Sequence, residues 1–464
     1  MKTIEDILRQ APASAAELIA ALDISQPTLS RKINDAPNVL KMGKGRATGY
    51  ALSREIGGER RFPLYRINQH GQVNQIATLF PIWPGDACAV EDSAGGWHLH
   101  DGLPWYLSDM RPQGFLGRVW GREIAARLDL PEDIRLWTEK HTLLALSQWG
   151  EATVGDLLLG ETSYQRFLDE QDDFRISVGN RLHGYLKLAE LSLAGEPVGS
   201  LAGGEQPKFS CIKALNDDDA EENLHVLVKF SLGATNENAT RWADLLQAEA
   251  IALATLRAEN IAASLAEIIL GPHGEVFLEL QRFDRLGVRG RRGMISLEAV
   301  AAEFLGSRAT SWIEAGKGLL KEGVITQAVF EQICQLYAFG KLIANSDMHA
   351  GNLSFLNDRQ GYVQQNSTAQ LIDPKSRPLP LSPVYDMLPM AFAPTSSGNM
   401  RQSIAPLELD SRVSRIYWQR AQKWALDFWQ QAAECSTISA EFRQLALQMR
   451  EQVEGLTANI SRLA

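Results

Sequence analysis

The stretch NSDMHAGNLSF, residues 345–355, follows directly on the apolar run LYAFGKLIA. It gathers Asp347, His349 and Asn352 around a single glycine, Gly351. An apolar run of this length favours a packed helix, and a helix that stops at an acid, an imidazole and an amide predicts a loop that carries chemistry. Surface loops of similar composition are common, so this stretch needs support from the rest of the chain.

The separation of Asp347 and Asn352 is the informative part of this loop. Protein kinases carry HRDxxxxN, in which the Asp accepts the proton of the substrate hydroxyl and the Asn binds magnesium. Asp347 and Asn352 have the same five-residue separation. His349 between them is a candidate phosphate contact, although a structural hydrogen bond explains a lone histidine equally well.

Other candidate residues precede this loop in the order that a kinase requires. Lys229 lies in HVLVKFS, a strand buried enough that its ammonium needs an anionic partner. Glu249, on the apolar side of the helix pattern WADLLQAEAIALATL, is a candidate for that partner. Before both, GSLAGGEQPK (199–208) is a glycine-rich turn whose backbone N–H groups could approach phosphate. After both, LELQRFDR (278–285) is a strand whose backbone could hydrogen-bond an adenine edge.

A second magnesium carboxylate should follow the loop, and two residues are candidates. Asp373 lies in QLIDPK and Asp386 in LSPVYDM, and the chain has no DFG motif. The spacing alone leaves both open.

Composition limits the class of protein. The chain has 464 residues, 45% hydrophobic, with a net charge of −10. We expect a multidomain cytoplasmic protein without a membrane span or signal peptide, because no apolar run approaches the roughly 20 residues of a membrane helix. Residues 1–61 have ten Lys/Arg against seven Asp/Glu, a net charge of +3, which leaves −13 for the remainder. The basic charge is concentrated in the N-terminal segment.

Residues 1–61 are predicted to form a winged helix-turn-helix domain. Three capped helical patterns precede VLKMGKGRATGYAL, which reads as a β-hairpin wing with a basic tip. Polar residues on the third helix and the tip are candidates for DNA contacts; they are Gln26, Thr28, Ser30, Arg31, Lys32, Lys41, Lys44 and Arg46. A small helical bundle used for protein contacts remains the alternative.

The patterns after residue 61 predict an α+β fold. Alternating aromatic strands open the segment 62–195, which then becomes helical; strands return in 196–284; and 285–464 is almost wholly helical. We therefore expect a small β-rich subdomain, then a bilobal, protein-kinase-like arrangement with a β-rich N-lobe and an all-α C-lobe.

Together, SLAGGEQPK, LVKFS, LQRFDR, SDMHAGNLSF and LSPVYDM resemble the HipA-like serine/threonine kinases, bacterial toxins of toxin–antitoxin systems. LPWYLSDMRPQGFLGR and LSQWGEATVGDLLL extend the similarity to roughly residues 62–440, and the whole chain resembles the stand-alone HipH (YjjJ) type with its own DNA-binding domain.

The resemblance implies ATP and Mg²⁺ as cofactors and a role for each motif residue. Asp347 would be the catalytic base, Asn352 and Asp386 would bind the metal, and Asp386 is preferred to Asp373 because it follows the family's apolar-Ser/Thr-Pro-x-Tyr run. Ser200 would be autophosphorylated. The remaining implied nucleotide contacts are Ala202, Gly203, Gly204, Gln206, Lys208, Lys229, Glu249, Gln281, Arg282, Phe283, His349 and Tyr385.

The resemblance also implies partners. The substrate would be a protein Ser or Thr, with an aminoacyl-tRNA synthetase as the candidate target. Double-stranded DNA would bind the N-terminal domain, and an antitoxin and a homodimer are further candidates. Two other functions stay open: a DNA-binding regulator whose kinase lobe only senses nucleotide, and a toxin that cleaves DNA with a metal.

Overall fold

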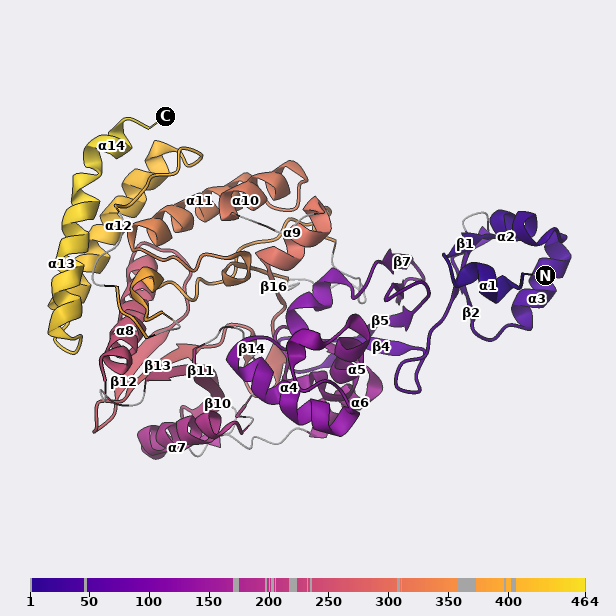
Figure 1. Cartoon of the computed structure of the whole chain (residues 1–464), viewed down its shortest axis with the longest axis horizontal. Helices are drawn as coiled ribbons and strands as arrows, with labels where there is room; N and C mark the ends of the chain where they lie inside the picture. The colour runs from indigo at the N-terminus through magenta and orange to yellow at the C-terminus, as the bar shows by residue number, and fades with distance from the viewer. Residues whose placement is uncertain are drawn as a thin grey trace. The chain divides into compact units, whose positions relative to one another are not determined.

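A computed structural model of the chain describes residues 2–45, 48–169, 175–196, 198–199, 201, 204, 206–216, 223–231, 233, 236–306, 309, 311–357, 373–395, 398–401 and 406–463. These residues form two compact units. The first unit contains the described residues up to 112 and those from 120 to 169. The second contains 113–119 and the described residues from 175 onward. Figure 1 shows the course of the chain.

The N-terminal part of the first unit contains three short helices and a β-hairpin. The elements are α1 (Ile4–Leu8), β1 (Ala13–Ser14), α2 (Ala15–Leu22), α3 (Gln26–Asn34), β2 (Val39–Met42) and β3 (Gly49–Leu52). Thr3 and Ser14 form capping boxes with Asp6 and Glu17, which explains where α1 and α2 begin. The hairpin β2–β3 is extended by β1 into a three-stranded sheet, so the predicted helices and hairpin are both present.

The rest of the first unit is a five-stranded antiparallel sheet with helices beside it. The strand order is β7-β6-β5-β4-β8. The strands are β4 (Phe62–Ile67), β5 (Val73–Pro81), β6 (Cys88–Asp92), β7 (Trp97–His100) and β8 (Leu157–Leu159), and the helices are α4 (Gly114–Leu128), α5 (Glu139–Trp149) and α6 (Glu161–Asp169). The first residues of α4 belong to the second unit.

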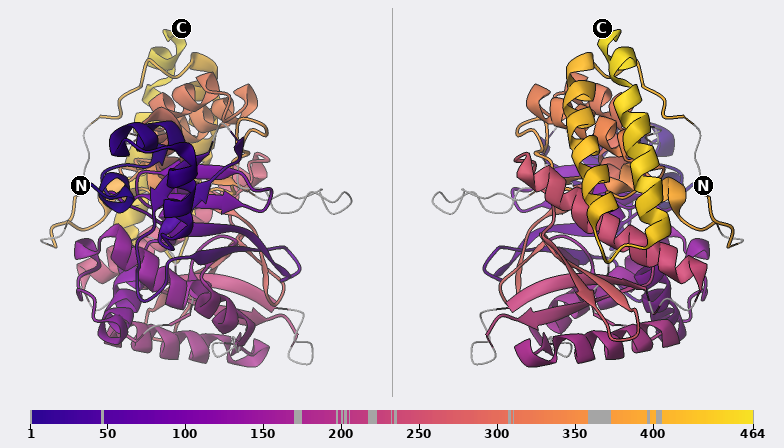
Figure 2. Two further views of the ribbon diagram at one scale, coloured as in Figure 1. Left: turned by 90° about the vertical axis from the view of Figure 1, so that its right-hand side faces the viewer. Right: turned by 90° about the vertical axis from the view of Figure 1, so that its left-hand side faces the viewer.

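A second five-stranded sheet organises the beginning of the second unit. Its order is β12-β13-β11-β10-β9, and the elements are β9 (Arg175–Ile176), α7 (Arg181–Ala194), β10 (Lys208–Ala214), β11 (Asn223–Ser231), α8 (Glu237–Ala258), β12 (Ala266–Leu270) and β13 (Val276–Gln281). Val226, Val228 and Phe230 alternate along β11 and pack with Tyr185 of α7. The intervening Lys229 points toward α8, so the two helices cover opposite faces of the sheet (Figure 2).

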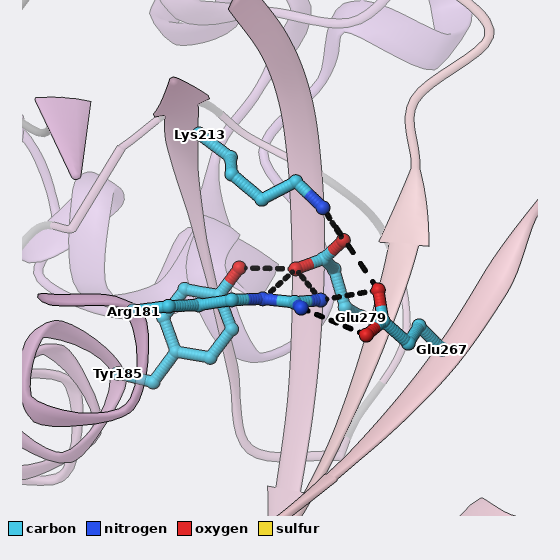
Figure 3. Close-up of polar contacts among 5 residues, drawn as sticks. All are labelled: Arg181, Tyr185, Lys213, Glu267 and Glu279. Carbon is cyan, nitrogen blue, oxygen red and sulfur yellow. Dashed lines mark hydrogen bonds and ion pairs between the residues drawn. The ribbon is translucent and has the colours of Figure 1, made fainter. Parts of the chain in front are cut away.

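A charged cluster fastens α7 to this sheet (Figure 3). The guanidinium of Arg181 donates to Glu279 at 2.8 Å and 2.5 Å and to Glu267 at 2.8 Å and 2.6 Å. Tyr185 Oη and Lys213 Nζ also donate to Glu279, at 2.5 Å and 2.6 Å. Residues 175–195, which we assigned to the preceding segment, therefore supply a strand and a covering helix to this sheet.

The remainder of the second unit is mainly helical. Its helices are α9 (Leu297–Leu305), α10 (Trp312–Lys321), α11 (Gln327–Leu342), α12 (Arg415–Glu434), α13 (Ala440–Gly455) and α14 (Thr457–Ser461). Two two-stranded sheets also occur here, β14 (Arg285–Leu286) with β15 (Gly290–Arg291) and β16 (Met294–Ser296) with β17 (Ser354–Leu356). The predicted mixed fold, with a β-rich lobe before a helical lobe, is confirmed, with these short strands as an addition.

In the described part of the chain, no helix is both long enough and apolar enough to cross a bilayer.

Candidate active site

The loop 345–352 begins where α11 ends. Ile343 caps α11, and Ala344 takes a left-handed backbone conformation (φ 60°) that ends the helix. The side chain of Asn345 then accepts a hydrogen bond from the N–H of Asp347 at 3.0 Å, which is a local turn typical of Asn. The predicted break after the apolar run is therefore made by Ala344 and Asn345.

Asn352 is hydrogen-bonded to the backbone of Asp347. Its Nδ2 donates to the carbonyl oxygen of Asp347 at 2.9 Å, and its own N–H donates to the carbonyl of His349 at 3.0 Å. Because the amide nitrogen faces this carbonyl, the amide oxygen Oδ1 points the other way. That oxygen is therefore available as a hard ligand beside Asp347.

The carboxylate of Asp347 is half exposed and lies near two other charged groups. Its Oδ1 is 4.0 Å from His349 Nε2, and its side chain is 51% exposed. Partial burial raises the pKa of Asp347, the charge of Asp386 raises it further, and His349 opposes this shift. A carboxylate with a raised pKa that solvent can reach suits proton acceptance.

Two side chains from other elements brace this loop. The indole Nε1 of Trp312, at the start of α10, donates to the carbonyl of His349 at 2.9 Å. Tyr385 Oη donates to the carbonyl of Gly351 at 3.0 Å and lies 2.6 Å from Ser354 Oγ. Tyr385, predicted as a nucleotide contact, therefore also fixes the loop.

Lys229 forms a buried ion cluster with two carboxylates. Its Nζ donates to Glu249 Oε1 and Oε2 at 2.9 Å and 2.8 Å and is hydrogen-bonded to Asp386 Oδ1. The side chains of Lys229 and Glu249 are 2% and 0% exposed, whereas that of Asp386 is 24% exposed. Glu249 is therefore closed off from solvent, whereas part of the Asp386 carboxylate can be reached from outside.

Each charge in this cluster shifts the protonation of the others. Burial alone would lower the pKa of Lys229, but Asp386 and Glu249 outweigh it and raise that pKa. Burial raises the pKa of Glu249, with Lys229 opposing it. For Asp386, the charges of Lys229 and Lys208 overcome burial and lower the pKa. Asp386 is therefore held ionised, as a metal ligand must be.

Asp386 and Asp373 differ in their surroundings. Asp373 is exposed, and its side chain accepts from the N–H of Lys375 at 3.1 Å within a turn. Asp386 instead contacts Lys229 and has a left-handed backbone (φ 51°), with its carbonyl accepting from Asn345 Nδ2 at 3.4 Å. Only Asp386 is brought to the lysine cluster.

The side chains here include a carboxylate and an amide oxygen, which are donor types that magnesium accepts. Among the described residues, there is no group of three or more His, Cys, Asp or Glu side chains that could hold a metal by itself. Magnesium in phosphoryl-transfer sites is held by one or two protein oxygens plus the substrate's phosphates. Asn352 Oδ1 and the Asp386 carboxylate would supply the protein oxygens.

A second lysine lies beside Lys229, under the glycine-rich turn. Lys208 and Lys229 are directly opposite in the β10–β11 pairing, and both are buried. The Lys208 ammonium is so close to Gly204 (φ 90°) that a Cβ there would lie 2.5 Å from Nζ. Gln206 follows in a partly exposed bend. The predicted contacts Ala202 and Gly203 and the predicted phosphorylation site Ser200 lie outside the described residues.

The segment 281–283 crosses from the sheet to the helical lobe. The N–H groups of Gln281 and Arg282 donate to the carbonyls of Leu265 and His225, both at 2.9 Å. The buried Arg282 side chain pairs with Asp284 and donates to the carbonyl of Leu201 at 3.2 Å. Because these N–H groups already donate to carbonyls of the protein, an adenine ring would have to contact other groups of the segment, such as its carbonyls or Phe283.

Comparisons with known proteins assign the chain to a family. Residues 58–168 match the family described as "YjjJ-like toxin, middle domain", and residues 200–456 match the "HipA-like C-terminal domain". The chain is 42% identical to Toxin YjjJ of Escherichia coli (strain K12) over 463 residues, which covers 100% of both proteins. The chain belongs to the HipA-like, YjjJ-type toxin family.

Solved structures resemble this HipA-like chain more distantly. The HipA–HipB–operator DNA complex of the Shewanella oneidensis MR-1 toxin–antitoxin system matches with a TM-score of 0.45 and 12% identity, covering 86% of this chain and 97% of the other. The Helicobacter pylori proinflammatory kinase CtkA matches with a TM-score of 0.38 and 10% identity, and the match covers 57% of this chain and 93% of the other. The family assignment rests on the family matches and the full-length relative.

The structure of this HipA-like chain also adds residues that the sequence did not single out. Phe115 N–H donates to the carbonyl of Gly204 at 2.8 Å, and a Cβ on Gly114 (φ 67°) would lie 2.4 Å from that carbonyl oxygen. The start of α4 therefore lies against Gly204, which is more than 80 residues away in sequence. The motif GFLGR was noticed only for its family resemblance, and nothing local indicated this contact or that of Trp312.

In the N-terminal part of the YjjJ-type chain, most of the predicted DNA contacts are exposed. They are Gln26, Ser30, Arg31, Lys32, Lys41 and Lys44, whereas Arg46 lies outside the described residues. Thr28 is only partly exposed, and its Oγ1 lies 3.0 Å from the N-cap oxygen of Ser25. Thr28 therefore helps to begin α3, which leaves less of it for a base contact.

Proposed function

We propose that the chain is an ATP-dependent serine/threonine protein kinase of the HipA-like toxin type. The observation that carries the proposal is the convergence of Lys229, Glu249 and Asp386 in one buried cluster, electrostatically linked to the loop of Asp347 and Asn352. A kinase needs this set: a lysine for the α/β phosphates, its glutamate partner, a metal carboxylate, a base and a metal asparagine.

Each residue has a defined part in the transfer. Lys229, steadied by Glu249, binds the α/β phosphates, and this draws its ammonium away from Asp386. Asp386 and Asn352 are the side chains that would hold magnesium, which would supply positive charge to the transferring phosphoryl group. Lys208 lies beneath the glycine-rich turn, where a further phosphate contact would form.

Asp347 orients the acceptor hydroxyl of a protein Ser or Thr. As the hydroxyl oxygen bonds to the γ-phosphorus, the bond from that phosphorus to the β,γ-bridging oxygen breaks and ADP departs. The hydroxyl proton passes to the Asp347 carboxylate. Family resemblance makes an aminoacyl-tRNA synthetase the first target to test.

Transfer from γ-labelled ATP tests the proposal, with wild type compared with Asp347→Asn, first alone and then in a cell extract. Label transferred by the wild type only would support a kinase, and the labelled band would identify the target. If neither protein transfers label while ATP still binds, the chain is a nucleotide-sensing regulator. Plasmid cleavage with magnesium and without ATP would instead indicate a DNA-cleaving toxin.

We also propose that Ser200 is autophosphorylated and that this inactivates the enzyme. The carbonyl of Leu201, the next residue, accepts from Arg282, and the carbonyl of Gly204 accepts from Phe115 N–H, with Gly204 close to the Lys208 ammonium. A phosphate dianion on Ser200 would repel the ATP phosphates and expel the turn. Ser200→Ala should therefore keep its activity during preincubation with ATP, whereas wild type should lose it.

DNA binding through residues 1–61 is a separate part of the proposal. Exposed Arg31 and Lys32 on α3, with Lys41 and Lys44 on the hairpin, offer cations to phosphates from a helix and a wing. We expect operator binding by the chain alone, as a dimer, without a helix-turn-helix partner.

A further inference from the structure

The helix that carries Glu249 has a second buried polar stripe. Arg241, Asp244 and Gln247 follow one another at three-residue intervals on α8, and their residues are 2%, 2% and 3% exposed. Side chains at three-residue intervals lie near one face of a helix. Because buried polar groups need hydrogen-bond partners, the segment packed on this face has to supply them.

The partners are the residues that begin α13. Asp244 Oδ1 accepts from the N–H of Ser439 at 2.8 Å, and its Oδ2 accepts from Ser439 Oγ at 2.6 Å. Thr437 Oγ1 donates to Gln247 Oε1 at 2.5 Å, and Gln247 Nε2 donates to the carbonyl of Thr437 at 3.2 Å. Ser439 is also the N-cap of α13, so Asp244 is bound to the cap of a helix 195 residues later.

Arg241 lies at the N-terminal end of this polar stripe on α8. It donates to Glu441 Oε1 at 2.8 Å and to the carbonyls of Phe392 and Arg401 at 3.3 Å and 3.4 Å, and its guanidinium lies 5.4 Å from the Phe442 ring centre. The segment that follows Asp386 and the start of α13 therefore both contact one side chain of α8.

We infer that Arg241, Asp244 and Gln247 are positioning residues that hold α8, through the start of α13, so that Glu249 stays against Lys229. This inference rests on the proposed kinase function, in which the lysine–glutamate pair must be in place for transfer. Glu249 is less than two turns from Asp244 along a continuous helix, so a rotation or shift of α8 moves both. In kinases whose glutamate-bearing helix is mobile, an activating partner holds that helix in place. Here the start of α13 would hold α8 in the same way.

A double-mutant cycle separates positioning from general stability. Asp244→Asn keeps the shape of the side chain but removes the negative charge to which Ser439 donates. Glu249→Gln removes the negative charge that pairs with Lys229. If Asp244 acts through Glu249, Asp244→Asn should lower kcat/KM for ATP roughly tenfold in the wild type. In the Glu249→Gln background it should change kcat/KM by less than about twofold. Equal, additive losses in both backgrounds would overturn the inference.

A control variant and a replacement variant distinguish the loss of positioning from unfolding of the protein. Thr326→Ala removes a comparable N-cap from α11, where Thr326 accepts from Val329 N–H at 3.3 Å, and it should not change the exchange of α8 amides. Hydrogen–deuterium exchange of residues 245–256 should speed up in Asp244→Asn but not in Thr326→Ala; equal rates would contradict the inference. If Asp244→Asn does not fold, Gln247→Met, which loses the Thr437 hydrogen bonds without a change of charge, takes its place in the cycle.

The cycle also distinguishes failure of the inference from failure of the proposed function. Phosphate transfer by the wild type with an additive cycle would leave the kinase standing and remove the positioning role. If the wild type transfers no phosphate, the proposed kinase fails, and the same cycle is run on the Kd for ATP with magnesium. Additivity in that measurement would overturn the positioning role too.

Discussion

The amide Nδ2 of Asn352 donates to the backbone carbonyl of Asp347 at 2.9 Å, so the side chain that is a candidate metal ligand also fixes the candidate base. Asn352→Asp keeps an oxygen ligand but replaces this donor with a second acceptor, which repels the carbonyl. We expect kcat to fall roughly 10²-fold, because removal of one positioned group in such sites costs on that order. The magnesium dependence of kcat measures the effect. An unchanged kcat at saturating magnesium would show that the hydrogen bond is irrelevant to transfer.

Removal of Lys229 should destabilise the fold as well as abolish activity. Lys229→Met removes the ammonium that both Glu249 and Asp386 contact, and loss of one partner of a buried ion pair typically costs about 3–5 kcal/mol. Urea unfolding would measure the loss. The double variant Lys229→Met, Glu249→Gln removes the uncompensated charge and should recover a large part of it. If the double variant is as unstable as the single one, the buried charge is not the cause.

Activity should fall on the acidic side at a pH above the ordinary pKa of an aspartate. Burial and the charge of Asp386 raise the pKa of Asp347. Since a base must be ionised to accept a proton, activity is present above this pKa and is lost as the pH falls through it. His349 opposes the shift, so His349→Gln should move the acidic limb of the kcat profile to higher pH. A limb that stays in place would exclude this electrostatic link.

Gly114→Ala should weaken ATP binding although Gly114 belongs to none of the nucleotide-site motifs. The added methyl would press on the Gly204 carbonyl, which a Cβ at this position would approach to 2.4 Å, and φ of 67° disfavours alanine. We expect KM for ATP to rise about tenfold, with kcat less affected, because the glycine-rich turn is displaced. Gly179→Ala is the control, since a Cβ there meets nothing within 4 Å.

DNA binding should depend on salt through the cations of α3. Each lost phosphate contact should reduce the slope of log K against log salt concentration by about one. The double substitution Arg31→Ala, Lys32→Ala in the full chain should therefore flatten the slope by about two. Lys2→Ala, which changes a lysine of the same domain outside α3, is the comparison. An equal slope in all proteins would mean that α3 does not face the phosphates.

Local patterns were enough to predict the mixed fold and the pairing of Lys229 with Glu249. A lysine in an apolar strand needs a carboxylate, and Glu249 on the apolar side of a helix is the residue that the structure brings to it. Capping residues predicted the helices of residues 1–34, and alternation predicted the strands. The roles of these residues in nucleotide and metal binding remain predictions.

Contacts between distant segments could not be predicted in the same way. Phe115 with Gly204, Trp312 with His349, and Asp244 with Ser439 each join elements far apart in the sequence. Each uses a single backbone group or a common polar side chain, so no periodicity or spacing marks it. The place of α7 on the second sheet was missed for the same reason, because its amphipathic pattern shows that it packs but not against what.

The Arg181 cluster sets a limit on how the HipA-like part can be cut out for separate study. A shortened protein that starts at residue 196 would lose Arg181 and Tyr185, and with them most of the hydrogen bonds to the buried Glu279 carboxylate. It would also uncover the apolar face of β11 that Tyr185 covers. A fragment beginning near residue 175 keeps β9, α7 and the Glu279 carboxylate together, but it loses residues 113–119 and with them the hydrogen bond from Phe115 N–H to the Gly204 carbonyl.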